Sequence, residues 1–310
     1  MSFSSKIFVR GLATSAKQWS PIKTVTIIGS GLMGSGIAQV AASTGHKVTV
    51  VDQTQDIVDK ASASIKKSLS RVVKKKFPDD PKAQQTYIAD TMGHLTLQTD
   101  AVSAVKSADL VVEAIVENLD VKRKLFATLD EAAPQHTVFA SNTSSIPIKD
   151  IAVATKRGDR FGGLHFFNPV PMMKLVEVIR IPETSEETYN ALEAFGKAVG
   201  KKTVQCKDEK GFIVNRLLVP YMVESIRLAE RGDASTRDID VAMKLGAGYP
   251  MGPFELLDYV GLDTIKFILD GWHESDPTNP LFQPCESLNK LVKENKFGMK
   301  TGEGFYSYDK

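Results

Sequence analysis

The chain has 310 residues, a length that suggests about two domains. Its hydrophobic fraction of 42% and charged fraction of 25% are ordinary for a soluble globular protein, and its net charge of +2 gives no argument for nucleic acid as a partner. Two cysteines, Cys206 and Cys285, lack metal-ligand spacing, which argues against a zinc site and a disulfide scaffold. No apolar run reaches the ~20 residues of a membrane span.

The N-terminal segment is basic and contains no acid. It carries Lys6, Arg10 and Lys17, is rich in Ser, Thr and Ala, and the first acidic residue of the chain is Asp52. It also lacks the apolar core of a secretory signal. These features predict a mitochondrial transit peptide over residues 1–22, with a disordered tail as the alternative. On either interpretation the segment lies outside the fold.

Residues 24–52 have the pattern of a dinucleotide-binding unit. A β-branched run at 24–28 is typical of a buried parallel strand, and glycines follow at once at positions 29, 31 and 34. Apolar residues then recur at helical spacing up to Gly45, a candidate C-cap, and a second strand is expected at 47–51. It ends in Asp52, 23 residues after the first glycine. A lone glycine motif is weak evidence, but this one lies between a strand and a helix, as the binding motif requires.

Each glycine has an expected role. Gly29 permits the tight turn, Gly31 lets the backbone approach a pyrophosphate, and Gly34 lets the helix pack close to the strand. The N-terminus of the helix would hold the anion. Asp52 would accept both hydroxyls of the adenosine ribose and repel a 2′-phosphate, and no arginine lies nearby to receive one. The motif therefore predicts NAD rather than NADP as the cofactor.

Residues 56–92 are predicted to form two helices, interrupted only at Pro78 and Pro81. The first helix carries a run of basic side chains: Lys66, Lys67, Arg71, Lys74, Lys75 and Lys76. A solvated helix face and an anion site near the cofactor are the two interpretations.

Further strand signals are found in LTLQTD (95–100), ADLVVEAIVEN (108–118) and TVFASNTSS (137–145). The second leads into Glu113 and Glu117, and the third into the polar cluster 141–145, where the carboxyl ends of parallel strands border a cleft. Hydroxyls and amides there are typical of a site, but they are also common helix caps. Ser145 could simply cap a helix near Ile148.

The stretch 162–180 contains a histidine and a glutamate in apolar surroundings. His165 lies in the segment LHFFN, and Glu177 has valine on both sides. A buried carboxylate is costly unless it is paired. Two strands joined by the short proline-rich connection 169–174 can lie side by side and bring the two residues together. A general base that titrates near neutral pH, oriented by an acid, is one interpretation; a structural pair in the core is the other.

A helix at 185–200 is followed by the segment KKTVQCKDEKGFIVNR. From residue 211 onward the pattern predicts helices only, which places the domain boundary near 205–211. Pro220 should kink the first of them. The predicted architecture is an α/β, Rossmann-type dinucleotide-binding domain over 23–206, with a helical insertion at 56–92, followed by an all-helical C-terminal domain over 207–310.

Seven segments together resemble the L-3-hydroxyacyl-CoA dehydrogenase family. They read IIGSGLMGSGIAQVAASTGH, VVEAIVEN, ASNTSS, GLHFFNPVPMMKLVEVI, GFIVNRLLVPY, GYPMGPFELLDYVGLD and KTGEGFY. The resemblance covers about residues 22–310 and is closest to the short-chain, monofunctional mitochondrial type. It implies NAD-dependent oxidation of an L-3-hydroxyacyl-CoA to the 3-ketoacyl-CoA in fatty acid β-oxidation, a location in the mitochondrial matrix, and a homodimer formed through the helical domain.

The resemblance also implies roles for individual residues. His165 matches the catalytic base and Glu177 its acidic partner, while Ser144 and Asn215 match residues that contact the reacting part of the substrate. Matches to coenzyme A contacts are Ser68, Lys75 and Ser144. Matches to cofactor-binding positions are Gly29, Ser30, Gly31, Leu32, Met33, Gly34, Asp52, Gln53, Glu117, Lys122, Asn142, Ser144, Asn168 and Lys300. No metal ligand is implied.

Three hypotheses for the function follow. The first is the acyl-CoA dehydrogenation just described. The second keeps the chemistry on a 3-hydroxy sugar acid, which would have no use for Lys75 and the basic helix. The third is a non-catalytic NAD-binding protein, which would tolerate the loss of His165, Glu177 or Ser144, yet all three are present.

Overall fold

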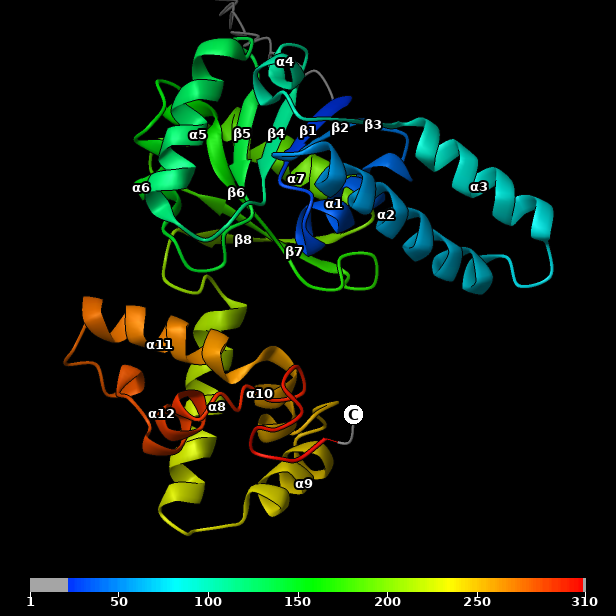
Figure 1. Cartoon of the computed structure of the whole chain (residues 1–310). Helices are drawn as coiled ribbons and strands as arrows, with labels where there is room; N and C mark the ends of the chain where they lie inside the picture. Colours follow the sequence, from blue (N-terminus) through cyan, green and yellow to red (C-terminus); the bar gives the residue numbers. More distant parts are fainter. Residues whose placement is uncertain (1–21, 309–310) are drawn as a thin grey trace, which may run out of the picture.

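The computed structural model describes residues 22–308, which form an α/β part and a helical part (Figure 1). The predicted transit peptide lies almost entirely outside the described residues. The α/β part consists of β1 (Thr24–Ile28), α1 (Leu32–Ala42), β2 (Lys47–Val51), α2 (Gln55–Lys76), α3 (Pro81–Gly93), β3 (Leu95–Gln98), α4 (Ala101–Val105), β4 (Leu110–Glu113), α5 (Leu119–Ala132), β5 (Val138–Ser141), α6 (Ile148–Ala152), β6 (Phe161–Phe166), β7 (Leu175–Arg180), α7 (Glu186–Ala198) and β8 (Lys202–Lys207).

Eight strands form one sheet in the order β3-β2-β1-β4-β5-β6-β7-β8. All neighbouring strands are parallel except β6 and β7, which are antiparallel. The strand order reverses between β1 and β4, so the connections that leave these two strands diverge. A crevice opens at such a switch point, beyond the carboxyl ends of the strands.

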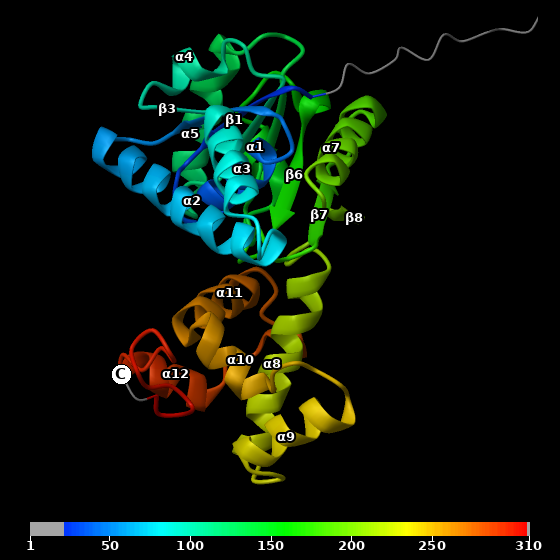
Figure 2. The same ribbon diagram turned by 90° about the vertical axis from the view of Figure 1, so that its right-hand side faces the viewer.

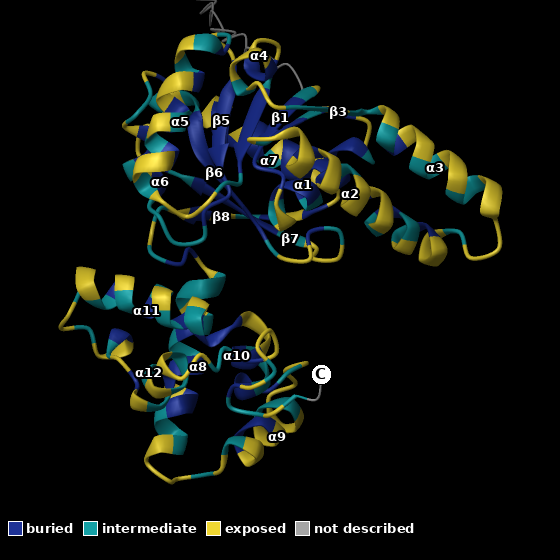
Figure 3. Cartoon of the chain, in the orientation of Figure 1, coloured by how far each residue is buried: buried dark blue, intermediate teal, exposed yellow. Residues whose placement is uncertain are grey.

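Helices cover both faces of the sheet, which explains why its central strands read as continuous apolar runs (Figure 3). One apolar core cluster joins the sheet to α1, α2 and α7, and the other joins it to α4, α5 and α6. The predicted α/β class with a helical C-terminal part is confirmed.

The helices α2 and α3 form a hairpin that projects beyond the sheet (Figures 1 and 2). Buried residues recur along α2 every three or four positions, at Val58, Ala61, Ile65, Leu69 and Val73, so one stripe packs on the protein and the opposite face is solvated. On α3, only Thr91 is buried. The prediction of two helices in this region is confirmed.

The helical part consists of α8 (Val214–Glu230), α9 (Thr236–Gly246), α10 (Pro253–Val260), α11 (Leu262–Ser275) and α12 (Glu286–Lys293). Long α8 starts beneath the sheet and runs the length of this part (Figure 2), with Pro220 inside it. The helical part has an apolar core cluster of its own, which includes Phe254, Leu257, Leu269 and Trp272. Within residues 22–308, no helix has the length and apolar character needed to cross a membrane.

Candidate active site

The glycine turn between β1 and α1 leaves room for a ligand at one position only. Gly29 has φ +96°, and a Cβ added there would lie 2.5 Å from the carbonyl oxygen of Ala114. A Cβ on Gly34 would lie 1.8 Å from the carbonyl oxygen of Gly29. A Cβ on Gly31 would meet no atom within 4 Å. Gly29 and Gly34 are therefore required by the packing, whereas the backbone at Gly31 faces open space at the start of α1, where a pyrophosphate fits.

Asp52 lies at the end of β2 beside this turn. Its carboxylate accepts hydrogen bonds from the backbone nitrogen of Ser30 at 2.7 Å, from the Ser30 hydroxyl at 2.8 Å and from the backbone nitrogen of Gln53 at 2.8 Å. Burial opposes ionisation, but these hydrogen bonds outweigh it and hold the pKa of Asp52 below its ordinary value. Gly29, Gly31, Asp52 and Gln53 line a cavity of about 410 Å³ whose other walls are largely apolar, including Ile115. A polar rim on an apolar slot fits an adenosine.

His165 and Glu177 face each other across the antiparallel strand pair β6 and β7. They are direct register partners in β6 and β7, and His165 Nδ1 lies 2.7 Å from Glu177 Oε2. Both are buried, at 3% and 0% exposure. The rings of Phe167 and Phe212 pack against the imidazole at centroid distances of 4.6 and 5.4 Å. The predicted proximity of the two residues is confirmed, while their catalytic roles stay predictions.

The second oxygen of Glu177 binds the start of the helical part. Its Oε1 accepts the backbone N–H groups of Ile213 at 3.0 Å and Val214 at 2.9 Å, in the first turn of α8. The positive end of the helix dipole therefore points at the carboxylate and helps to hold its charge. Asn215 is half-buried in the same turn. One side chain thus connects His165 to the helical part, a link that the sequence alone does not reveal.

Ser144 contacts the imidazole of His165 at the ring nitrogen opposite Glu177. Its Oγ lies 3.1 Å from His165 Nε2, and its backbone nitrogen donates to Glu117 Oε1 at 3.1 Å. The same Glu117 oxygen accepts the hydroxyl and backbone N–H of Ser145. Asn142, two residues earlier, accepts the backbone N–H of Phe166 at 2.9 Å. The polar turn after β5 is therefore attached both to Glu117 and to β6.

The helix-cap interpretation of Ser145 is wrong. The Ser145 side chain binds Glu117, and α6 has no side-chain cap from its own N-terminal segment. Asp208, just after β8, instead accepts the backbone N–H groups of Ile148 at 2.8 Å and Lys149 at 2.9 Å. Burial raises the pKa of Asp208 despite these bonds. This distant cap gives no local signal in the sequence.

Glu117, whose side chain is 30% exposed, forms a charge cluster with the buried residues Glu113 and Lys122. Lys122 Nζ lies 3.1 Å from Glu117 Oε2 and 2.5 Å from Glu113 Oε1. Burial favours the neutral form of Glu117, but Lys122 and the hydrogen bonds outweigh it, and the net effect lowers the pKa of Glu117. The sequence places Glu113 at the end of a strand but indicates no role for its side chain.

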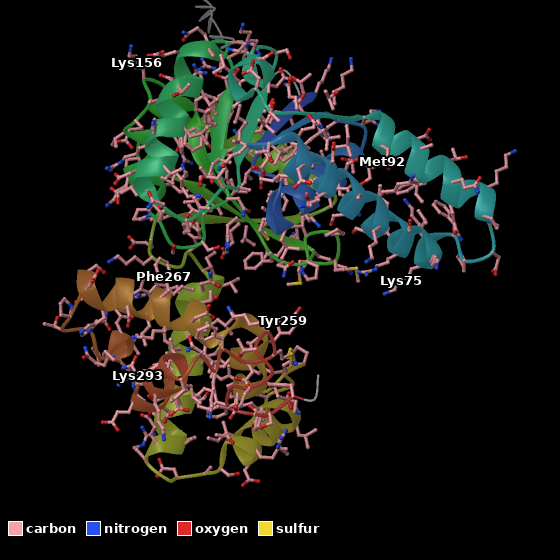
Figure 4. All side chains as sticks on the ribbon, viewed as in Figure 1. Lys75, Met92, Lys156, Tyr259, Phe267 and Lys293 are labelled. Carbon is pink, nitrogen blue, oxygen red and sulfur yellow. The ribbon has the colours of Figure 1, made fainter. Side chains whose placement is uncertain are left out.

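A groove with a basic rim runs along α2. Its lining includes Ser30, Gly31, Leu32, Ser68 and Asn168, and its charged side chains are Lys60, Lys67 and Arg71. Lys75 does not line it: Lys75 is exposed near the outer end of α2, two turns beyond Ser68 on the same helix (Figure 4). Ser68 and Lys75 therefore lie two turns apart along the same helix, so an extended anionic ligand could contact both.

A further cavity lies where α11 approaches the polar turn. Met33, Glu117, Lys122, Asn142 and Ser144 line one side, and Thr264, Phe267 and Ile268 line the other. Figure 4 shows Phe267 on the face of α11 that is turned toward the α/β part. Lys300 is exposed and pairs with Asp263, at the start of α11, at 2.5 Å.

The glycine turn, the acid after β2 and a His–Glu pair at the same edge of the sheet define a nicotinamide-dinucleotide-dependent dehydrogenase as the class of protein. Two family models match the chain: 3-hydroxyacyl-CoA dehydrogenase, NAD binding domain, over residues 24–209, and the C-terminal domain of the same family over residues 211–308. The chain belongs to the 3-hydroxyacyl-CoA dehydrogenase family.

Relatives match over nearly their whole length. The mitochondrial hydroxyacyl-coenzyme A dehydrogenases of Homo sapiens and Rattus norvegicus are 62% and 63% identical to this chain over 313 aligned positions, covering 99% of this chain and 100% of each relative. Among solved structures, (S)-3-hydroxybutyryl-CoA dehydrogenase from Ralstonia eutropha is 39% identical with a TM-score of 0.88, covering 93% of this chain and 100% of that one. FadB2 of M. tuberculosis is 41% identical with a TM-score of 0.87, covering 94% and 100%.

Proposed function

We propose that this protein oxidises L-3-hydroxyacyl-CoA to 3-ketoacyl-CoA with NAD, as a step of fatty acid β-oxidation. The observation that carries the proposal is the buried His165–Glu177 pair, whose free imidazole nitrogen faces Ser144 at the edge of the cofactor cavities. The mitochondrial relatives, which are named for hydroxyacyl-coenzyme A dehydrogenation, support the same substrate class.

His165 is the general base. Because Glu177 Oε2 can only accept when it is ionised, Nδ1 carries the proton of the neutral imidazole and Nε2 is left with a lone pair. Ser144 Oγ then donates to Nε2, at the place where a substrate hydroxyl can bind. As C3 loses its hydride, Nε2 takes the hydroxyl proton, and Glu177 stabilises the imidazolium that results. Bound NAD supplies the nicotinamide ring that accepts the hydride.

The proposed cofactor residues lie along the crevice from the glycine turn to the polar turn. Asp52 binds the adenosine ribose and disfavours a 2′-phosphate, and the backbone at Gly31 faces the pyrophosphate. The remaining proposed contacts come from Gly29, Ser30, Leu32, Met33, Gly34, Gln53, Glu117, Lys122, Asn142, Ser144, Asn168 and Lys300.

Coenzyme A is proposed to lie along α2, against Ser68 and Lys75, with its thioester end at Ser144 and Asn215. The basic rim of the neighbouring groove supplies the charge that the phosphates of coenzyme A need. A phosphate contact on α2 also distinguishes an acyl-CoA substrate from a sugar acid, because a sugar acid has no phosphate to bind there.

The proposed setting is the mitochondrial matrix, with residues 1–22 as a cleaved transit peptide; the relatives quoted above are named mitochondrial. We further propose an NAD-binding domain over 23–206 and a helical domain over 207–310 that forms a homodimer. Exposed apolar side chains on the helical part, among them Leu217 and Leu245, support such an interface.

The direct test is the loss of NADH absorbance when acetoacetyl-CoA is added to the pure protein. We expect rapid consumption of NADH, slow consumption of NADPH and no reaction with free acetoacetate, which lacks coenzyme A. Turnover of a 3-keto sugar acid, in the absence of turnover of acetoacetyl-CoA, would contradict the proposal and support the sugar-acid alternative.

A further inference from the structure

A cluster of three charged side chains lies beneath the polar turn, and only two of them reach the cavity beside Ser144. Glu113 and Lys122 are 0% and 1% exposed, and Glu117 completes the cluster through its Oε2 contact with Lys122. Glu113 also accepts the hydroxyl of Ser141 at 2.6 Å and the backbone N–H of Ile115 at 2.7 Å. Each oxygen of Glu113 therefore has a donor.

The cluster contains two carboxylates and one ammonium group. Lys122 donates to both acids, and the further donors to Glu113 and Glu117 are hydroxyl and backbone N–H groups, which stabilise ionised carboxylates. The lowered pKa of Glu117 agrees with an ionised state. The cluster consequently has a net charge of −1, which solvent screens only in part, because Glu113 and Lys122 are buried while the Glu117 side chain is 30% exposed.

The charge lies where the nicotinamide end of the cofactor is expected. Glu117 and Lys122 line the cavity that contains Ser144, and this cavity shares Ala114 and Ile115 with the cavity beside Asp52. A dinucleotide whose adenosine fills the Asp52 cavity therefore extends its other end toward Ser144 and His165. Glu113 lines neither cavity. It affects a bound ligand only through its charge and through its ion pair with Lys122.

We propose that the Glu113–Lys122–Glu117 cluster is an anionic pole that favours the oxidised cofactor over the reduced one. The nicotinamide ring of NAD⁺ is cationic and that of NADH is neutral, so a net negative charge beside it stabilises only the oxidised form. The proposal rests on the proposed function only for the identity of the cofactor.

Glu177 is the matching pole at the other end of the site. During oxidation of the substrate, the positive charge of the cofactor disappears and His165 gains one, directly against Glu177 Oε2. The site then has a cation beside an anionic group both before and after the reaction. Two fixed anionic groups of this kind keep the bound reactants and the bound products close in free energy. Neither complex is then so stable that it slows turnover.

The test compares dissociation constants rather than rates. The Kd for NAD⁺ is measured by calorimetry and the Kd for NADH by fluorescence, on the full-length protein, without acyl-CoA. Glu117→Gln and Glu113→Gln each remove one negative charge, the first at the cavity wall and the second behind it. Ser141→Ala removes a hydrogen bond from the cluster without changing its charge, and Glu131→Gln makes the same charge change at an exposed position on α5.

The ratio Kd(NAD⁺)/Kd(NADH) should rise about tenfold in Glu117→Gln and in Glu113→Gln, and stay within about twofold of wild type in the other two variants. An unchanged ratio in a folded Glu113→Gln protein overturns the proposal, as does an equal rise in Ser141→Ala, which would make the effect one of geometry. If Glu113→Gln does not fold, Glu117→Gln decides by the same criterion. A protein that shows these ratios but does not oxidise acyl-CoA would refute the proposed function and leave the anionic pole intact.

Discussion

Replacement of Glu177 by glutamine tests the role of its hydrogen bonds to His165 and to the start of α8. The variant keeps the volume, but one of its two terminal atoms becomes an N–H₂ donor. The start of α8 presents two backbone donors to one oxygen of residue 177, and His165 presents one donor to the other. The amide oxygen therefore turns to α8, and the N–H₂ group faces Nδ1 of His165.

This orientation selects the wrong tautomer of the imidazole. A donor opposite Nδ1 requires a lone pair there, so the proton moves to Nε2 and the base can no longer accept from the substrate. We expect kcat to fall by roughly 10²–10⁴-fold with the affinity for NAD nearly unchanged, because this is the range lost when a base or its orienting acid is removed. The charge-assisted bonds to α8 become neutral ones, while the cost of a buried charge disappears, so stability should fall by only about 1–3 kcal/mol.

The assay is the rate of NADH consumption with acetoacetyl-CoA, together with thermal unfolding followed by circular dichroism. Glu183→Gln, the same change at an exposed residue after β7, is the matched control and should behave as wild type. A Tm lowered by no more than several degrees, with turnover nearly lost, agrees with an orienting role. Turnover within about threefold of wild type, or a variant that does not fold, would mean that Glu177 is structural and that something else orients His165.

Three other predictions follow from the proposed cofactor, substrate and location. Asp52→Ala should weaken NAD binding and narrow its preference over NADP. Hydrogen bonds hold the pKa of Asp52 below its ordinary value, so the wild-type affinity for NAD should persist until the pH falls below the ordinary pKa of an aspartate, which calorimetry across pH can check. Lys75→Ala should raise the KM for acyl-CoA with little change in kcat, since a remote phosphate contact is equally present in the ground and transition states, and the effect should shrink at high salt. Lys74→Ala is the control. A KM that is unchanged in Lys75→Ala at low salt would mean that coenzyme A does not bind along this helix. A reporter protein fused to residues 1–25 should enter the mitochondrial matrix and be cleaved, and a reporter that stays in the cytosol would contradict the predicted leader.

The sequence was most informative where local pattern and chain connectivity decide the structure. The glycine turn could be predicted because Gly29 and Gly34 meet a backbone carbonyl that leaves no room for a Cβ. The pairing of His165 with Glu177 could be predicted because a short connection joins two strands that are both apolar, and such strands are usually neighbours.

Long-range contacts of polar groups could not be predicted in the same way. Backbone N–H groups at the start of α8 donate to Glu177, and those of α6 donate to Asp208. These hydrogen bonds join segments 36 to 60 positions apart, and they depend on where whole elements come to lie. Glu113 and its partner Lys122 are only nine positions apart, but their contact depends on how the strand and the following helix pack together. In sequence, each of these residues looks like an ordinary acid or helix start.

The measurement that tests the central claim most directly is the oxidation of L-3-hydroxybutyryl-CoA by NAD⁺ across pH, in wild type and in His165→Gln, with NAD⁺ binding measured on both proteins. The account predicts that wild-type kcat rises with pH, because a general base accepts a proton only in its unprotonated form, and that D-3-hydroxybutyryl-CoA is not oxidised. His165→Gln should bind NAD⁺ normally, turn over at least 10²-fold more slowly and lose this pH dependence. A His165→Gln protein that binds NAD⁺ and retains wild-type turnover and the same pH dependence would contradict the account.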